Sequence, residues 1–215
     1  MKNVLAALSL TLVLAACQSE ISDKPAAQVG DATTATAPVA ADAADAVTAN
    51  VIKEKSRIDF VGAKVTRDHD GSFKNFDGSI AYVQGKPERI HFTIDLDSIV
   101  TDDEKLTGHL KTADFFDVAK YPQARFTSTS LTEAPAGTAD GATHLLKGTL
   151  EMHGVQKEVT VPVKAEQTPE GVRATSQFTI NRHDWGISYK GMADDLIKDN
   201  VLIKLDMAFP PPPAA

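Results

Sequence analysis

The chain has 215 residues, of which 42% are apolar and 24% charged. This ordinary globular composition disfavours collagen, wholesale disorder and a protein with several membrane spans. The net charge is −7, and no run of Lys or Arg occurs, which argues against a nucleic-acid partner. With one cysteine, the fold has to be stabilised by a packed core rather than by internal disulfides.

The N-terminus carries an apolar run, residues 4–16, after the positive charge of Lys2. The run is shorter than the roughly 20 residues that a bilayer requires, but it has the length of a signal-peptide core. It ends in Leu-Ala-Ala before Cys17, which resembles the bacterial lipoprotein signal. This resemblance implies that residues 1–16 are removed and that Cys17 is acylated, anchoring the chain to a membrane. Gln18 favours the outer membrane, with the protein facing the periplasm. The alternative to acylation is that Cys17 is an incidental thiol.

Residues 18–50 are rich in Ala, Thr and Asp, with almost no large apolar side chain. Such a segment cannot bury a core, so we expect residues 17–50 to comprise the lipidated cysteine and a disordered tether. Residues 210–215 predict a short proline-rich tail. The folded domain is therefore expected over residues 51–209.

Within this domain, apolar side chains alternate with polar ones, as in strands. Ile90, Phe92 and Ile94 show the pattern clearly. Short connectors with turn residues favour antiparallel hairpins. Eight such runs predict an all-β fold, either a barrel, which we favour, or a sandwich. The runs cover residues 58–65, 73–83, 90–96, 125–131, 144–152, 159–163, 172–180 and 201–209.

A helical insert is expected between strands, within residues 98–122. Thr101 and Glu104 have the spacing of a capping box, and Leu106, His109 and Leu110 share one helical face. A second short turn is expected at residues 114–116. An insert of this length with structure of its own suggests a lid or plug at one end of the barrel.

Three motifs then occur in order. They are Phe73-x-x-Phe76-x-Gly78, the segment from His109 to Phe126 with Asp-Phe-Phe-Asp and Lys-Tyr-Pro, and the segment from Gly148 to Val159. Together they resemble the YceI-like polyisoprenoid-binding family. The resemblance implies a lipocalin-like eight-stranded antiparallel β-barrel in the cell envelope, with an isoprenoid chain in its interior. It also implies no shared catalytic residues and no cofactor other than a bound polyisoprenoid or quinone-like lipid.

An isoprenoid chain requires a continuous apolar lining, which an eight-stranded barrel either provides or fills with its own side chains. The predicted inward-facing candidates are Phe60, Phe76, Ile90, Phe92, Ile94, Phe126, Leu150, Phe178 and Trp185. On the insert, Leu106, Leu110, Phe115 and Phe116 are candidates for gating one mouth. Each of these side chains is also an ordinary core residue in a filled barrel.

Other chemistry has little support in the sequence. The six histidines include no pair with metal-ligand spacing. Asp68-His69-Asp70 before Gly71 predicts a solvated turn, and His183 and Asp184 are expected on opposite faces of a strand. The leading hypothesis is thus a membrane-anchored lipoprotein that binds or shuttles an isoprenoid lipid. The second is an envelope interaction or stress-protection module with a filled barrel, and an enzyme ranks last.

Overall fold

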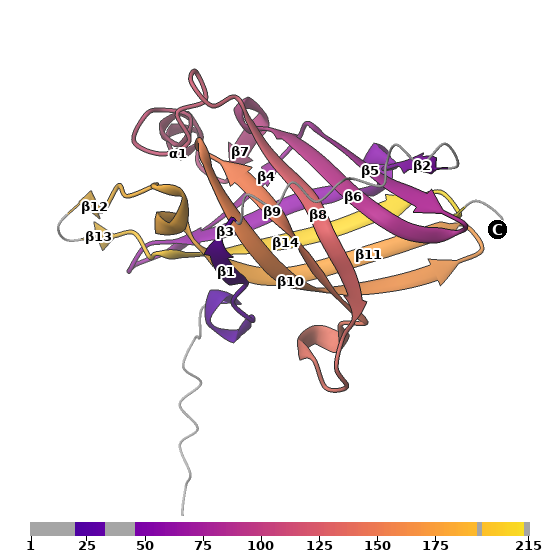
Figure 1. The fold of residues 1–215 in the computed structure, drawn as a ribbon. Helices are drawn as coiled ribbons and strands as arrows, with labels where there is room; N and C mark the ends of the chain where they lie inside the picture. The colour runs from indigo at the N-terminus through magenta and orange to yellow at the C-terminus, as the bar shows by residue number, and fades with distance from the viewer. Residues whose placement is uncertain (1–19, 33–45, 193–194, 213–215) are drawn as a thin grey trace, which may run out of the picture.

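The described residues form a curled 12-stranded antiparallel sheet, a separate two-stranded sheet and one short α-helix at one end (Figure 1). This computed structural model describes residues 20–32, 46–192 and 195–212. The expected signal peptide and Cys17 lie outside the described residues. The predicted all-β, barrel-like fold is confirmed.

Eight long strands form the wall of the barrel, and each coincides with one of the predicted runs. In sheet order their neighbours are hydrogen-bonded and antiparallel throughout, from β5 through β6, β8, β9, β10, β11 and β14 to β3. The strands are β3 (Arg57–Ala63), β5 (Phe76–Val83), β6 (Lys86–Asp95), β8 (Gln123–Glu133), β9 (His144–Met152), β10 (Val155–Thr168), β11 (Gly171–Asn181) and β14 (Asn200–Phe209).

A further strand, β4 (Asp68–Phe73), corrects the prediction of a solvated turn at Asp68-His69-Asp70. β4 pairs with β3 and with the short β7 (Ile99–Thr101). His69 is buried on this strand, with 8% of its surface exposed. The strand has no apolar alternation to reveal it, because its inner face carries His69, Gly71 and Phe73. Two backbone ladders hold it instead.

The N-terminal segment is also more ordered than the predicted tether. It forms a 3₁₀ turn, η1 (Glu20–Asp23), and β1 (Gln28–Asp31), which pairs with β10. β10 and β11 pair only from Lys164 and Thr175 toward their hairpin, and they diverge at Pro162, which has no N–H to donate. β1 pairs with β10 beyond this point, and Ala27 and Pro25 exchange backbone hydrogen bonds with Thr179 of β11. Residues 25–31 therefore fill the gap between the diverging ends of β10 and β11, here called the seam.

The end of the predicted tether is ordered as well. β2 (Val47–Asn50) pairs with β5. The next two residues connect opposite sides of the sheet, because the Val51 amide donates to Gly78 and the Ile52 amide donates to Ala208, each at 2.8 Å. A 3₁₀ turn, η3 (Lys53–Lys55), then leads into β3. The ordered domain accordingly begins before residue 51.

The insert contains the expected helix, α1 (Glu104–Leu110), but its cap differs from the prediction. Asp103 is the N-cap and accepts hydrogen bonds from the amides of Lys105 and Leu106. Thr101 instead bonds to Thr107 and to the backbone of Asp103. The remaining short elements are η4 (Leu96–Ser98), η5 (Ala139–Gly141), η6 (Arg182–Trp185), β12 (Gly191–Met192) and β13 (Asp195–Leu196).

Glycines on the inner face of the barrel make room for aromatic rings. A Cβ built on Gly71 would lie 2.1 Å from the ring of Phe60, its cross-strand partner. Gly78 stands in the same relation to Phe92, at 2.2 Å. The rings can thus lie flat across the neighbouring strand only because these positions lack side chains. This explains the glycine in the first sequence motif.

Candidate lipid-binding interior

The barrel contains a cavity of about 140 Å³ at the end covered by α1, here called the helix-end chamber. Its wall comes from β3, β4, β11 and β14, and its lining is apolar except at three side chains, Lys64, His69 and Arg182. The apolar residues that line it are Phe60, Ala63, Phe73, Leu106, Leu110, Phe115, Phe116, Met152, Ile180, Ile187, Ile197, Val201 and Ile203.

The insert covers this chamber as a lid. Leu106 and Leu110, one turn apart on α1, face the chamber together with Phe115 and Phe116 from the following turns. The ring of Phe116 packs edge-on against Phe73 of β4, with the centroids 6.0 Å apart. A helix of seven residues is too short to be stable alone, so this packing holds the lid in place.

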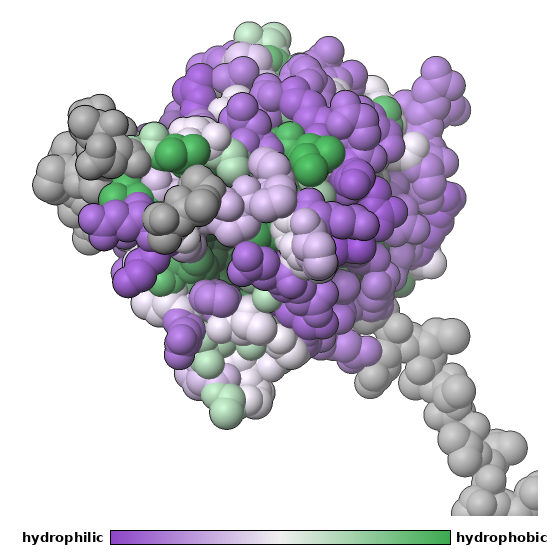
Figure 2. All heavy atoms as spheres, turned by 90° about the vertical axis from the view of Figure 1, so that its right-hand side faces the viewer, coloured by the Kyte–Doolittle hydropathy of each residue, from purple (hydrophilic) through white to green (hydrophobic). Residues whose placement is uncertain are grey.

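A second cavity, here called the far chamber, occupies the opposite end and has a volume of about 360 Å³. Ile80, Ile90, Phe92, Leu205 and Met207 contribute to its apolar wall. Its rim is more polar and includes His144, Glu166, Gln167 and Thr175. Figure 2 looks toward this end and shows hydrophobic side chains recessed within a largely hydrophilic surface.

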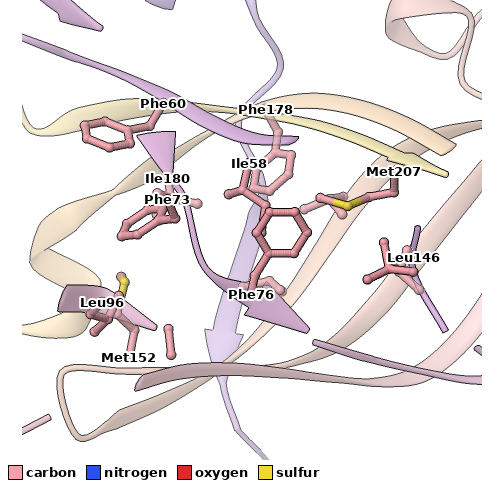
Figure 3. Close-up of a cluster of buried hydrophobic side chains, with 14 of the residues drawn as sticks. Ile58, Phe60, Phe73, Phe76, Leu96, Leu146, Met152, Phe178, Ile180 and Met207 are labelled. Atoms are coloured by element: carbon pink, nitrogen blue, oxygen red, sulfur yellow. The ribbon is translucent and has the colours of Figure 1, made fainter. Parts of the chain in front are cut away.

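Three buried side chains, Ile58, Phe76 and Phe178, separate the chambers and are here called the partition. Figure 3 shows them between Phe60 and Phe73, which line the helix-end chamber, and Met207, which lines the far chamber. Each partition residue is at most 7% exposed. The partition therefore consists of buried apolar side chains.

The structure distributes the predicted lipid-binding residues other than Trp185 over four environments. Phe60 and the four lid residues line the helix-end chamber, whereas Ile90 and Phe92 line the far chamber. Phe76 and Phe178 belong to the partition. Ile94, Phe126 and Leu150 pack half-buried against the core without lining either chamber. Each of these three comes from a strand of the β6, β8 and β9 wall.

Trp185 departs from the prediction of an inward-facing lining residue. It lies in η6, is fully buried and donates its indole N–H to the carbonyl of Leu150 at 3.2 Å. Its own carbonyl oxygen lies 3.0 Å from His153 Nδ1. Trp185 therefore anchors η6 to the β9–β10 hairpin and lines neither chamber. A tryptophan beside a turn glycine gives no sequence signal that separates these roles.

Sequence reasoning missed the polar groups of the helix-end chamber. His69 Nδ1 lies 2.8 Å from Asp102 Oδ1, just before the lid helix, and Arg67 donates to the other oxygen of Asp102 at 3.1 Å. The hydrogen bond from His69 is the main reason that the pKa of Asp102 lies below its usual value. Within the described part of the chain, His69 Nε2 has no hydrogen-bond partner.

Arg182, by contrast, is committed to the protein itself. It is 5% exposed and donates to the carbonyls of Ile187, Ile197 and Lys198, with a further contact to Asp199. Burial lowers the pKa of its guanidinium. Arg182 thereby fastens both arms of the loop that follows η6 at the helix end. A lone Arg after a strand gave no indication of this role.

The far chamber has one comparable group, Tyr82. It is 4% exposed and lines the chamber, and burial raises the pKa of its hydroxyl. Among the described residues, none forms a hydrogen bond to this hydroxyl.

Residues 50–209 match the YceI-like domain family. The chain belongs to this family. A UPF0312 protein of Pseudomonas putida is 33% identical over 142 residues, which cover 62% of this chain and 71% of the relative. Protein YceI of Escherichia coli is 38% identical over 96 residues, covering 44% and 47% of the two chains.

Solved structures share the fold of this YceI-like domain. BcnA of Burkholderia cenocepacia superposes with a TM-score of 0.64 and 26% identity, covering 73% of this chain and 98% of BcnA. A domain from Saccharophagus degradans, described as polyisoprenoid binding and implicated in plant cell wall breakdown, gives 0.61 and 17% identity, covering 76% and 98%. The family resemblance inferred from the three motifs is confirmed.

Two further observations concern the described residues of the YceI-like domain. They contain no group of three or more His, Cys, Asp or Glu side chains placed to hold a metal ion. Over the same ranges, no helix has both the length and the hydropathy needed to cross a bilayer.

His183, predicted on a strand, lies in η6 and contacts Asp199 at 2.7 Å on the surface.

Proposed function

We propose that this YceI-like domain binds, and exchanges with a membrane, an isoprenoid lipid of the polyisoprenoid or quinone-like class, without covalent chemistry. The observation that carries the proposal is the pair of apolar chambers at the two ends of the barrel interior. Interiors normally pack with few voids larger than a water molecule, so two such spaces in one small barrel need an explanation. The Saccharophagus domain of the same fold, described as polyisoprenoid binding, supports this use of the architecture.

Energetics favour exchange over permanent capture. Burying a 40-carbon chain from water would contribute about 32 kcal/mol at ~0.8 kcal/mol per carbon, more than non-covalent affinities reach. A membrane lipid, however, already lies in hydrocarbon. The free energies of the lipid in the barrel and in the bilayer therefore nearly balance, and transfer can run in either direction.

We further propose that the protein is an envelope lipoprotein held at the outer membrane through Cys17. The sequence signal supports this, and the docking of η1 defines the geometry. Ile21 packs in a cluster with Val61, Ala63 and Leu202 at the helix end. Glu20 also pairs with Lys204 at 2.8 Å. Cys17 lies three positions before Glu20, a span of at most about 10 Å, so the anchor would hold the helix end close to the bilayer.

The lipid proposal is tested by mass spectrometry of an organic extract from the chain with Cys17→Ala, purified without detergent. We expect an isoprenoid near one per protein. Phe116→Ser in the lid should reduce this ratio severalfold, because it weakens the cover of the helix-end chamber. The matched control Val100→Ser, at an exposed site on β7, should leave it unchanged. A protein that is repeatedly free of lipid would instead favour the interaction module.

The anchor proposal is tested by fractionation of cells that produce the full chain. We expect the wild type with the outer membrane and Cys17→Ala in the soluble periplasmic fraction. Membrane association that persists in Cys17→Ala would contradict the anchor and would leave the lipid-binding proposal standing.

A further inference from the structure

One polar side chain points into the helix-end chamber from the wall of the barrel. His69 shares a strand face with Phe73, four residues on, and both line the chamber. The whole residue is 8% exposed and its side chain 10%. A histidine on the apolar inner face of a barrel is unusual, because buried polar groups normally have hydrogen-bond partners.

The ring of His69 is held in one orientation. Nδ1 lies 2.8 Å from the Asp102 carboxylate, whose other oxygen accepts from Arg67 at 3.1 Å. The Asp102 amide also donates to the carbonyl of Asp70 at 3.0 Å, which fixes the carboxylate relative to β4. With Nδ1 committed, Nε2 is the remaining polar atom of the ring. It has no partner among the residues that the structure describes.

Two cations also line the chamber, Lys64 and Arg182. Lys64 already has a partner within the protein, and Arg182 does not compete for this role. The guanidinium of Arg182 is occupied by three backbone carbonyls and by Asp199. Negative charge gathers on the lid side of His69, where Asp102 is followed by Asp103 and Glu104. A strongly anionic ligand group would meet this charge, whereas an uncharged oxygen would not.

Building on the proposed function, we propose that His69 is the recognition residue for the headgroup of the lipid, and that this headgroup is an uncharged oxygen group. When Nδ1–H donates to Asp102, Nε2 accepts a hydrogen bond from a hydroxyl; a protonated ring donates to a carbonyl. The headgroup then lies beneath α1, and the tail points past the partition toward the far chamber.

Three probes with one 15-carbon tail test this: farnesol, the hydrocarbon without its oxygen, and farnesyl diphosphate. Binding to the delipidated Cys17→Ala chain is measured by displacement of an apolar fluorescent dye. We expect His69→Leu to weaken farnesol binding about tenfold, equivalent to about 1.4 kcal/mol, and to leave hydrocarbon binding unchanged. His69→Gln, which keeps a donor and an acceptor, should lose only two- to threefold.

A matched control separates this effect from the general removal of a histidine. His91 of β6 contacts two threonine hydroxyls and lines neither chamber. His91→Leu should therefore bind farnesol as the parent chain does. Because the hydrocarbon probe needs an intact interior, its unchanged affinity in His69→Leu also shows that this variant is folded.

The remaining outcomes decide between alternatives. Equal loss of farnesol and hydrocarbon binding in His69→Leu, or no loss of either, would overturn the assignment. Loss of farnesol binding in Tyr82→Phe alone would place the headgroup in the far chamber and overturn it too. Tightest binding of the diphosphate would overturn the uncharged class. If the parent chain binds none of the probes, the proposed function itself fails.

Discussion

The two ends of the barrel interior differ in how they are closed. At the helix end, a short helix, aromatic turns and an arginine-fastened loop cover a small apolar chamber. At the far end, hairpins and residues near the C-terminus surround a larger chamber with a polar rim, and no helix among the described residues covers it. One end is thus covered by elements that the rest of the sheet does not need, which is typical of an entrance rather than of a structural seal.

The difference extends to the polar groups within each chamber. At the helix end, an aspartate from the lid orients His69, so the lid and the recognition atom are one unit. In the far chamber, none of the described residues orients the hydroxyl of Tyr82 in this way. A ligand with one polar end and a long apolar tail matches this asymmetry. The interior is therefore better described as an oriented site than as a symmetrical tube.

The largest effect is expected from removing the division between the chambers. Phe76→Ala should lower the free energy of unfolding by about 3–5 kcal/mol, because a fully buried ring is replaced by a cavity. Urea unfolding measures the change. Val65→Ala, at a side chain that is 68% exposed, is the control and should stay within about 0.5 kcal/mol. Similar stabilities for the two variants would show that Phe76 does not divide a packed interior.

The next effect should be confined to the helix end. Arg182→Met leaves the carbonyls of Ile187, Ile197 and Lys198 without their donor and should cost on the order of 3 kcal/mol. Hydrogen exchange should accelerate at Ile187 and Ile197 but not at Leu205 in the far chamber. The control Arg173→Met removes an exposed ion pair with Asp206 and should have a much smaller effect on stability, because solvent screens exposed pairs. Uniform acceleration over both ends would contradict a local role for Arg182.

A smaller effect should distinguish two glycines near the helix-end chamber. Gly71→Ala places a Cβ against the ring of Phe60 and should destabilise the domain by about 1–3 kcal/mol. Gly62, on the neighbouring β3, has open space where a Cβ would lie, with no atom within 4 Å, so Gly62→Ala should be neutral or stabilising by up to about 1 kcal/mol. Thermal unfolding of both variants measures the contrast. Equal changes in stability for the two variants would show that the ring of Phe60 moves aside without cost.

The sequence predicted the wall of the barrel far better than its seams. Alternating apolar residues mark a strand that has one face on a core, as in Ile90 to Ile94, so the eight long strands were accessible. β4 was not, because its inner face carries a histidine and a glycine. β1 was not, because it is held at the seam near Pro162 by backbone hydrogen bonds rather than by apolar burial. That proline, within an otherwise regular strand, was the available signal.

The candidate site was predictable in composition but not in arrangement. The lid side chains Leu106, Leu110, Phe115 and Phe116 were recognised from helical spacing and from their place in a long insert. Which aromatic residues line a chamber and which divide it depends on ring volumes across several strands, as for Phe60 and Phe76. Contacts between His69 and Asp102 join positions 33 residues apart. Local patterns carry no information at that distance.

The smallest effect concerns the pH dependence of the lid contact. The hydrogen bond from His69 lowers the pKa of Asp102 in the folded chain. The contact therefore stabilises the fold above the unfolded pKa of about 4, and this contribution is lost as the pH falls through the lower, folded value. Because the Asp102 side chain is 36% exposed, screening should limit the contribution to about 0.5 kcal/mol.

Chemical unfolding of Asp102→Asn between pH 7 and pH 3 measures this contribution. The variant should be slightly less stable than the parent near neutral pH, and the difference should vanish at the acid end of the range. Glu166→Gln, at the rim of the far chamber, is the control. The pKa of Glu166 is also lowered, through its contact with Lys164, but it is exposed and contacts no lid. If only the Asp102 variant weakens farnesol binding at neutral pH, the acid at the helix end orients the recognition histidine, and the acid at the far end does not.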